Sequence, residues 1–168
     1  MKELFGQYGR VTVSHSATGS FHINCYLNQT FNFLFLKDSI PQWVKKNRHT
    51  FSAFIAGYTD AEGNFILNQK RGRFKIDSYD FKILDGIKDF LIMSGVGVRF
   101  RRIAQKGGER GRGKKWNNDL WRLNVNEARS LKKFIRFIWP YLRHEKRRAD
   151  AGVVLENVNS RISNETTR

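Results

Sequence analysis

The sequence contains a single cysteine, Cys25, among its 168 residues. One cysteine excludes a disulfide bond within the chain and a zinc site built from cysteine ligands. The four histidines are scattered without metal-ligand spacing, and we interpret them as surface or packing residues. No apolar run reaches the length of about 18 residues typical of a transmembrane helix, so none is predicted. The N-terminal residues also lack the apolar segment of a signal peptide.

Negative charge is scarce as well. The chain has 31 lysines and arginines against 15 aspartates and glutamates, a formal net charge of +16, and an isoelectric point near 10.4. Such an excess of positive charge repels itself in a compact fold and is typical of proteins with a polyanionic partner. The basic residues are spread along the chain and interleaved with aromatic residues, which favours nucleic acid over a membrane surface as that partner.

The most informative segment is FIAGYTDAEGNF at residues 54–65. It predicts an apolar helix that ends in two acidic residues, Asp60 and Glu62, followed by a glycine and a strand. Carboxylates are unfavourable at the C-terminal end of a helix because the helix dipole is negative there. Their presence indicates a bound cation, and hard cations such as Mg2+ prefer oxygen ligands. The alternative is a core helix with a solvated acidic end.

Small residues recur along the same predicted helix. Ser52, Ala53, Ala56, Gly57 and Ala61 form two ladders with small-xxx-small spacing, which lets the backbone of a second helix approach closely. Glycine within a helix costs about 1 kcal/mol relative to alanine. Gly57 therefore indicates a close helix contact at this point.

These residues resemble the signature motif of the LAGLIDADG homing endonuclease family. In that family the motif helix packs against a second copy of itself, and the last acidic residue of each motif binds the divalent metal ions that cleave DNA. By position this residue is Glu62, and Asp60 is the earlier acid near the helix end. The resemblance therefore implies a partner helix from another copy or another chain, and Mg2+ as the cofactor if the chain is catalytic.

The residues after the motif match one complete unit of that family, from Thr50 to about Asn159. Hydrophobic periodicity and turn residues predict the order helix-ββ-helix-ββ-helix. The predicted elements are a helix at 51–61, strands at 64–69 and 73–79 around a hairpin turn at Arg71-Gly72, a helix ending at Ser94-Gly95, strands at 96–103 and 120–126, and helices at 127–138 and about 144–159. The resemblance implies an α+β, LAGLIDADG homing endonuclease-like fold, with an antiparallel saddle-shaped sheet and the motif helix at the interface between units or subunits.

An internal repeat indicates part of a preceding unit. The segment Phe21–Asn24 recurs as Trp121–Asn124, and Phe35–Lys37 recurs as Phe134–Arg136. Each similarity is weak alone, but both occur in the same order. The early segments match the third and fourth strands and the following helix of a unit. Either the chain is part of a two-unit protein, or it has lost its beginning through truncation or evolutionary decay.

The repeat divides the chain into three predicted segments. They are a partial first unit at 1–49, a complete unit at 50–159 and a C-terminal tail at 160–168.

The predicted strands present polar side chains on a common face, because alternate residues of a strand point the same way. Arginine, lysine and asparagine are side chains that read base edges in a major groove. The candidate nucleic-acid-binding residues on this face are Asn64, Asn68, Lys70, Arg73, Lys75, Arg99, Arg101 and Arg122. The alternative is the ordinary solvated face of an antiparallel sheet.

A basic, glycine-rich loop lies at residues 105–115. Its glycines predict that it has no stable secondary structure, and we expect it to order on a phosphate backbone and to add affinity without sequence choice. Its candidate contacts are Lys106, Arg110, Arg112, Lys114 and Lys115. The same composition is typical of segments that contact RNA with little sequence preference.

The resemblance also implies a lysine near the scissile phosphate, shortly after the proline of the penultimate helix. Lys46 matches this place in the partial first unit. The same count from Pro140 in the second unit reaches Glu145, with Lys146 next along. A glutamine that positions water in some relatives falls near Tyr79. The candidate catalytic residues are thus Glu62, Lys46 and Lys146, and the candidate metal ligands are Glu62 and Asp60.

Two functions are compatible with these observations. The first is a site-specific homing endonuclease that makes metal-dependent double-strand cuts in DNA, which the intact pair of Asp60 and Glu62 favours. The second is a non-cleaving RNA-binding relative, such as an intron maturase or a component of an organellar ribosome, which the missing first motif and the glycine-rich loop favour. The expected partner is duplex DNA or structured RNA and not a membrane, and the resemblance favours a mitochondrion or plastid as the location.

Overall fold

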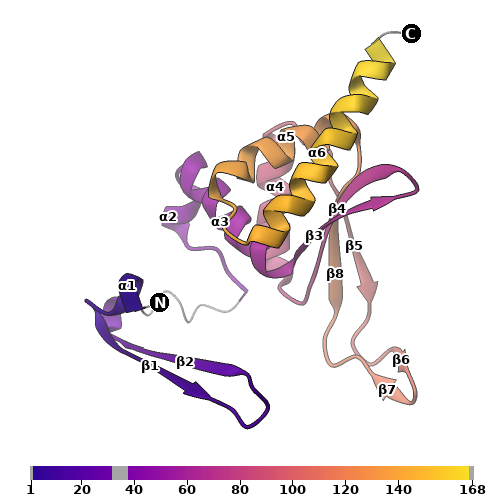
Figure 1. Ribbon diagram of the computed structural model, residues 1–168. Helices are drawn as coiled ribbons and strands as arrows, with labels where there is room; N and C mark the ends of the chain where they lie inside the picture. The colour runs from indigo at the N-terminus through magenta and orange to yellow at the C-terminus, as the bar shows by residue number, and fades with distance from the viewer. Residues whose placement is uncertain (1, 32–37, 167–168) are drawn as a thin grey trace. The chain divides into compact units, whose positions relative to one another are not determined.

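The computed structural model describes residues 2–31 and 38–166. The chain divides into two compact units, Met1–Lys37 and Asp38–Arg168 (Figure 1). The repeat segment Phe35–Lys37, from which a helix of the first unit is predicted, lies outside the described residues. Within the described part of the chain, no helix combines the length and the hydrophobicity that crossing a bilayer requires.

The first unit contains a short helix and a β-hairpin. Helix α1 spans Lys2–Phe5, strand β1 spans Gly9–His15 and strand β2 spans Phe21–Leu27. The strands are antiparallel and pair along their whole length, from Gly9 opposite Leu27 to His15 opposite Phe21. The two strands predicted for this region, as the third and fourth strands of a unit, are therefore present as β1 and β2.

The second unit has the predicted order helix-ββ-helix-ββ-helix and is an α+β fold. Its elements are α2 (Gln42–Lys45), α3 (Arg48–Glu62), β3 (Gly63–Asn68), β4 (Arg71–Ser78), α4 (Phe81–Met93), β5 (Arg99–Ala104), β6 (Glu109–Gly111), β7 (Lys114–Lys115), β8 (Leu120–Val125), α5 (Ala128–Ile138), a 3-10 turn (Trp139–Tyr141) and α6 (Glu145–Thr166). Four strands form an antiparallel sheet in the order β3-β4-β8-β5. The helices gather on one side of this sheet (Figure 1).

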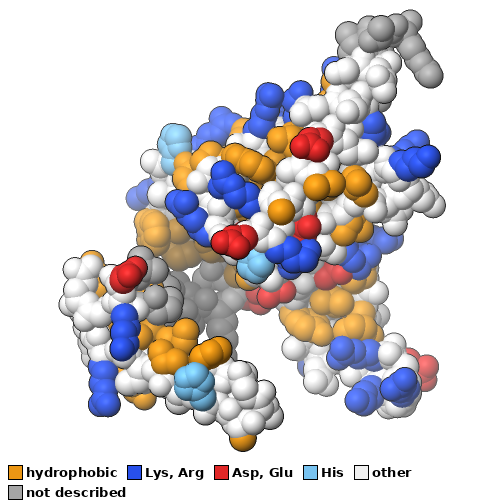
Figure 2. Space-filling model, viewed as in Figure 1, with side chains coloured by type: hydrophobic (Ala, Val, Ile, Leu, Met, Phe, Trp, Pro, Cys, Tyr) orange, Lys and Arg blue, Asp and Glu red, His pale blue; other side chains and the backbone are white. Residues whose placement is uncertain are grey.

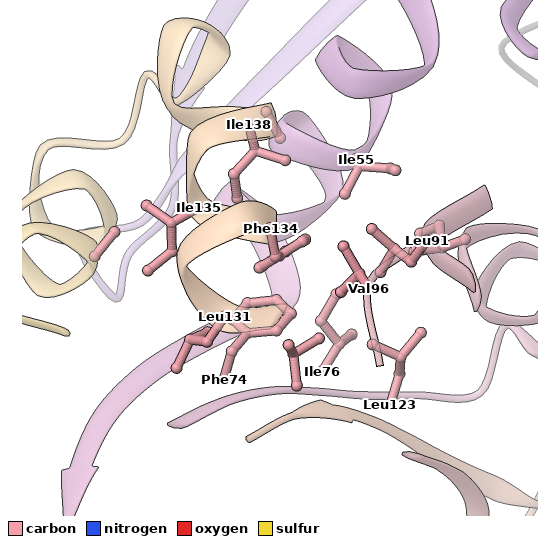
Figure 3. Close-up of a cluster of buried hydrophobic side chains, with 14 of the residues drawn as sticks. Ile55, Phe74, Ile76, Leu91, Val96, Leu123, Leu131, Phe134, Ile135 and Ile138 are labelled. Carbon is pink, nitrogen blue, oxygen red and sulfur yellow. The ribbon is translucent and has the colours of Figure 1, made fainter. Parts of the chain in front are cut away.

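The core lies between the sheet and these helices. Phe74 and Ile76 of β4 and Leu123 of β8 occupy alternate strand positions and are fully buried. Phe134 of α5 packs against Phe74 with ring centroids 4.5 Å apart (Figure 3). Because apolar residues take every second strand position on this side, the polar residues between them, such as Lys75, must face away from the helices.

Helix α3 carries the motif and is present as predicted, although it begins at Arg48 rather than at Phe51. Asn47 caps it by accepting a 2.7 Å hydrogen bond from the N–H of His49. The helix ends at Glu62, and Gly63 continues directly into β3 in an extended conformation. The two acidic residues of the motif therefore lie at the helix end, as the sequence predicts.

The predicted hairpin turn at Arg71-Gly72 is wrong, because the turn lies two residues earlier. Gln69 and Lys70 have φ angles of +50° and +60°, and Arg71 already pairs with Asn68 across the strands. A two-residue turn with both residues in the left-handed region matches the twist of the flanking strands. The candidate binding residue Lys70 thus lies in the turn and not on a strand.

Gly72 instead lies within β4, where helix α6 approaches the sheet. A Cβ atom at this position would come 2.9 Å from Cγ1 of Val154. The Gly72 N–H donates a 2.8 Å hydrogen bond to Oδ1 of Asn157, and the Asn157 side-chain amide donates to the carbonyl of Lys70 at 3.0 Å. The glycine is therefore required for helix packing and not for a turn.

Two further predictions of secondary structure are wrong. The glycine-rich loop contains a small β-hairpin, in which β6 pairs with β7. Helix α6 continues to Thr166, so residues 160–166 of the predicted tail are helical. The stop of α4 is confirmed: Gly95 has a φ angle of +69°, and its N–H donates to the carbonyl of Ile92 at 2.8 Å.

Candidate nucleic-acid interface

The side of the four-stranded sheet that faces away from the core is polar and mostly basic, and we call it the polar sheet face. Strand pairing brings the predicted binding residues together across three strand boundaries: Asn64 lies opposite Lys75, Ile66 opposite Arg73, Asp77 opposite Arg122, Lys75 opposite Asn124, Arg99 opposite Asn124, and Arg101 opposite Arg122. A groove of about 300 Å³ on this face is lined by Arg73, Lys75, Arg99, Arg101 and Arg122, among others.

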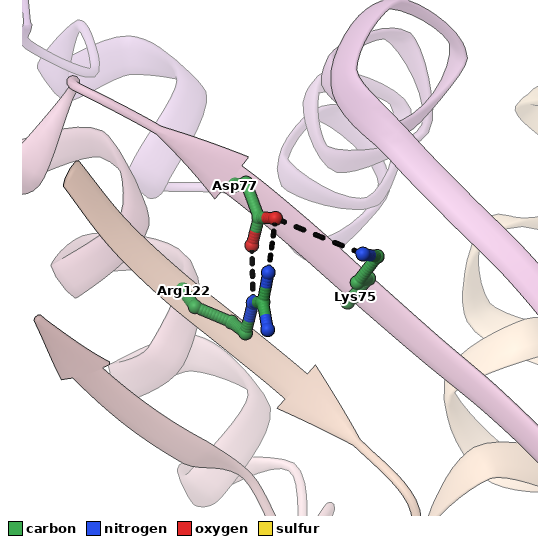
Figure 4. Close-up of polar contacts among 3 residues, drawn as sticks. All are labelled: Lys75, Asp77 and Arg122. Carbon is green, nitrogen blue, oxygen red and sulfur yellow. Dashed lines mark hydrogen bonds and ion pairs between the residues drawn. The ribbon is translucent and has the colours of Figure 1, made fainter. Parts of the chain in front are cut away.

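Two cations of the polar sheet face, Arg122 and Lys75, already pair with Asp77. Arg122 of β8 donates from Nε and Nη2 to the two carboxylate oxygens of Asp77 on β4, with both distances 2.6 Å (Figure 4). The Lys75 ammonium lies 3.8 Å from the same carboxylate. The hydrogen bonds with Asp77 raise the pKa of Arg122 above its usual value. Arg122 is therefore held in one orientation, and its charge is largely neutralised.

The other arginines of the face have no acidic partner. No described acidic side chain pairs with Arg73, Arg99 or Arg101. The Nε of Arg73 is buried and has no hydrogen-bond partner among the described residues. Unused guanidinium donors that line a groove are suited to phosphate oxygens or to base edges.

The β6–β7 hairpin carries the candidate loop contacts and is anchored at its base. The backbone N–H of Lys106 donates to Oδ1 of Asp119 at 2.7 Å, and Arg102 donates to Oδ2 at 3.1 Å. These two interactions hold the pKa of Asp119 below its usual value. The predicted loop is therefore tied to the sheet at its root, a contact that the sequence analysis missed.

The hairpin tip is formed by residues that accept positive φ angles. Gly111, Arg112 and Gly113 have φ angles of +93°, +53° and +71°, so two of the loop glycines permit a tight turn. The Arg110 guanidinium lies over the Trp116 ring, 4.7 Å from its centroid. The described hairpin residues Arg112, Lys114 and Lys115 are exposed and project their charges from a defined scaffold.

The two motif acids differ in their surroundings. Glu62 is exposed, and its carboxylate has no partner in the described part of the chain. Asp60 accepts a 2.8 Å hydrogen bond from the backbone N–H of Arg143 through Oδ2, while its Oδ1 is buried without a partner. Glu62 is therefore available to a cation, whereas Asp60 already connects α3 to the segment before α6.

The residues described here do not form a complete metal site. No group of three or more histidine, cysteine, aspartate or glutamate side chains lies close enough to hold an ion in residues 2–31 and 38–166. Hard divalent cations require several oxygen ligands. The carboxylate of Glu62 fits such an ion in its chemistry, but further ligands have to come from a second motif, from water or from the nucleic acid.

The two small-residue ladders of α3 face in different directions. Ser52 and Ala56 are buried in the core, with exposed fractions of 4% and 0%. Gly57 and Ala61 are exposed and Ala53 is half-buried. A Cβ atom at Gly57 would meet nothing within 4 Å. Among the described residues, the ladder Ala53-Gly57-Ala61 is therefore uncovered at Gly57 and makes no close contact there.

The two candidate catalytic lysines have different neighbours. Lys46 is exposed at the C-terminal end of α2. Lys146 pairs with Asp150 at 2.6 Å, and both line a hollow of about 330 Å³ together with Asn64, two residues beyond Glu62. The structure therefore brings Lys146 near the end of the motif. Asp150 was missed, although its spacing of four residues from Lys146 is a recognisable helix-pair signal.

The position assigned to a water-binding residue has no free acid beside it. Tyr79 is 48% exposed. Of the nearby acids, Asp77 is paired with Arg122, and Asp80 accepts a 3.0 Å hydrogen bond from the Tyr58 hydroxyl. Burial raises the pKa of Tyr58. The Ser78 hydroxyl lies 2.7 Å from the same Tyr58 oxygen, so the network ties α3 to the end of β4.

The chain is similar to a known domain family and to several solved structures. The family model of the LAGLIDADG-like domain matches residues 51–138, just over half of the chain, and no curated protein matches significantly. Two similar solved structures are the homing endonuclease I-CvuI with its target Sro1.3 (TM-score 0.45, 21% identity, 67% of this chain and 68% of that chain) and the LAGLIDADG meganuclease I-CpaMI bound to uncleaved DNA (TM-score 0.47, 20% identity, 68% of this chain and 37% of that chain). I-CvuI in complex with the I-CreI target gives a TM-score of 0.44, with 21% identity over 67% of this chain and 68% of that chain.

Proposed function

The chain belongs to the LAGLIDADG-like domain family, and from this premise we propose that it binds nucleic acid through the polar sheet face and cleaves duplex DNA in a metal-dependent reaction. The family match confirms the resemblance that the sequence motif indicates. The single observation that carries the binding proposal is the groove on the polar sheet face, with Arg73, Lys75, Arg99 and Arg101 in its lining.

The chemistry of this groove suits a duplex. Arg73, Arg99 and Arg101 can each donate two hydrogen bonds to guanine, and Asn68 and Asn124 present amides of the kind that recognise adenine. Salt bridges to phosphates supply affinity that does not depend on sequence. The anchored β6–β7 hairpin adds exposed cations at the far end of β5 and β8. Base contacts therefore come from the sheet and backbone contacts from the hairpin.

Cleavage would depend on Glu62. Its exposed carboxylate at the end of α3 is free to bind a divalent ion, and Mg2+ bound there would activate water and stabilise the leaving oxygen. Asp60 would hold the helix end in place through its contact with Arg143. Lys146, beside Asn64 in the adjoining hollow, is suitably charged to contact the phosphate that is cut.

A second motif helix would complete the site. In the ladder Ala53-Gly57-Ala61, no described atom lies within 4 Å of a Cβ placed at Gly57, and small residues at this spacing allow two helix backbones to pack closely. Pairing through this ladder would bring two Glu62-type carboxylates together. The partner helix would come from another copy of the chain or from a different chain.

A second candidate function is RNA binding without cleavage. It is favoured by one observation: the described residues hold a single exposed motif carboxylate and no ion-binding cluster. A basic sheet with an arginine-rich hairpin can bind structured RNA through phosphates and 2′-hydroxyls. In this case the motif helix would have a structural role only.

Competition binding separates the two candidates. The chain is bound to a labelled random-sequence duplex, and unlabelled duplex DNA or an RNA hairpin of equal charge is added at the same ionic strength. Stronger competition by duplex DNA, with cutting after Mg2+ is added, supports the nuclease. Stronger competition by RNA, with no cutting of any duplex in a random library, would overturn it.

A further inference from the structure

A second basic surface lies on helix α5, away from the polar sheet face. Lys132 and Lys133 each lie three or four residues from both Arg129 and Arg136, so the four side chains share one side of the helix. With Ile162 of α6 they line a hollow of about 320 Å³. We call these four residues the α5 basic face. In Figure 2, lysine and arginine side chains lie along the top of the helical layer, where Figure 1 places α5.

The α5 basic face and the polar sheet face point in opposite directions. The other side of α5 is buried, with Leu131, Phe134 and Ile135 fully enclosed in the core. Phe134 contacts the inner side of β4 through Phe74, whereas Lys75, the next residue of β4, belongs to the polar sheet face. The helix and the sheet therefore separate the two surfaces, and one straight duplex cannot contact both.

Glu127 is a partial counter-charge for Arg129 at the start of the α5 basic face. No described acidic side chain forms an ion pair with any of its four residues. The nearest acid in sequence, Glu127, uses its carboxylate to cap the helix by accepting from the N–H groups of Arg129 and Ser130. By contrast, Lys88 of α4 pairs with two aspartates.

This arrangement is unfavourable for an isolated helix. Like charges at spacings of three and four residues repel each other. Arg129 also lies in the first turn of α5, where the helix dipole already presents positive charge. Glu127 at the N-cap already offsets part of the dipole effect, and a bound polyanion would relieve the repulsion between the four cations. The charges span seven residues, which is about 10 Å of helix at 1.5 Å per residue, and a nucleic-acid strand presents a phosphate about every 3.4 Å along its axis.

We propose that the α5 basic face binds the phosphate backbone of a second nucleic-acid segment while the polar sheet face holds the first. The surface offers charge and no base-reading amides, so binding there is independent of sequence. Among the described lining residues of the hollow, Ile162 alone is apolar, and one such residue does not provide the apolar surface that a membrane-inserting helix needs. Duplex DNA and RNA share the backbone chemistry, and the experiment has an arm for each. The inference rests on the proposed function only for the first segment.

The test asks whether one protein molecule holds two nucleic acids. The full chain is bound to one equivalent of a donor-labelled random duplex, and an acceptor-labelled probe is added, a second duplex in one arm and an RNA hairpin in the other. Energy transfer between the labels reports a complex with both. The arm with the tighter second binding identifies the preferred source of the backbone.

Three charge-neutralising variants locate the second site. In the α5 variant, Lys132, Lys133 and Arg136 are replaced by glutamine. The matched control replaces Lys2, Lys45 and Lys82, which are exposed and are not among the residues that define either surface. The α5 variant should lose energy transfer, keep the first duplex, and lower the salt slope of the second binding by up to about 2.7 on duplex DNA, because each phosphate contact contributes about 0.9. The control should keep both probes.

The third variant separates the two proposals. Replacing Arg73, Lys75 and Arg101 by glutamine should weaken the first binding and leave the α5 site intact. If this variant binds normally, the sheet proposal fails while the α5 inference stands. Absence of energy transfer with either probe in the natural chain, or an equal loss in the α5 variant and its matched control, would overturn the α5 inference. Equal melting temperatures for the α5 variant and its control establish that a loss of energy transfer in the α5 variant does not come from unfolding.

Discussion

Oδ2 of Asp60, near the end of the motif helix α3, accepts a 2.8 Å hydrogen bond from the backbone N–H of Arg143. This contact joins the helix end to the segment that enters α6, over a sequence separation of 83 residues. The second motif acid, Glu62, is exposed, and its carboxylate has no hydrogen bond or ion pair among the described residues. The two acids of the motif therefore divide into a structural residue and an available ligand.

Asp60→Ala should lower the free energy of unfolding by about 1–2 kcal/mol, since a hydrogen bond to a charged acceptor is lost at a partly exposed site. Urea denaturation would show a lower midpoint at an unchanged slope. Asp60→Asn keeps an acceptor oxygen and should retain part of the stability. If Asp60→Ala leaves the midpoint unchanged but abolishes cleavage, Asp60 is a metal ligand instead.

Glu62→Gln should abolish Mg2+-dependent cleavage and leave both stability and nucleic-acid affinity unchanged. The amide removes a charged oxygen ligand, while the polar sheet face keeps all of its cations. Cleavage of a selected duplex target and its binding by fluorescence anisotropy are measured on the same preparation. Cleavage at the natural rate by the variant would disprove the assignment of Glu62 as a metal ligand.

Gly57→Leu and Ala56→Leu form a matched pair on α3. Gly57 faces open space in this chain, so leucine should raise the stability of the single chain by roughly 0.5–1 kcal/mol through helix propensity and prevent close helix pairing. Ala56 is fully buried, and leucine there should cost about 1–3 kcal/mol through overpacking. Sedimentation measures assembly and thermal denaturation measures stability. An assembly that survives Gly57→Leu would exclude the exposed ladder as the contact.

Local patterns in the sequence were sufficient to predict most elements of the second unit. Apolar residues at helical spacing, such as Ile83 and Ile87, predict α4, and the alternation around Phe74 and Ile76 predicts β4; both residues of each pair are buried. The face that carries Lys75 follows from the same alternation. These predictions succeed because the period of each pattern depends only on neighbouring residues.

The errors have a different origin, because they depend on contacts between distant residues. Gly72 is a glycine because α6 passes 82 residues later in the sequence, at Val154, and a glycine beside an arginine also resembles a turn. The β6–β7 hairpin has a defined structure because Asp119 anchors its base. The role of Asp60 depends on a backbone group of Arg143. None of these contacts produces a periodic signal in the sequence.

Asp77→Asn should tighten binding to random-sequence duplex DNA. The bidentate pair holds Arg122 on the polar sheet face, and Lys75 lies 3.8 Å from the same carboxylate. Neutralising Asp77 removes a repulsive charge and releases Arg122, so the slope of log affinity against log salt should steepen by about 0.9 for one new phosphate contact. Anisotropy titrations at several salt concentrations measure this slope, with Asp85→Asn on α4 as a control of equal charge. Weaker binding by Asp77→Asn alone would show instead that Asp77 orients Arg122 for a base contact, because a released arginine would then lose the geometry on which recognition depends.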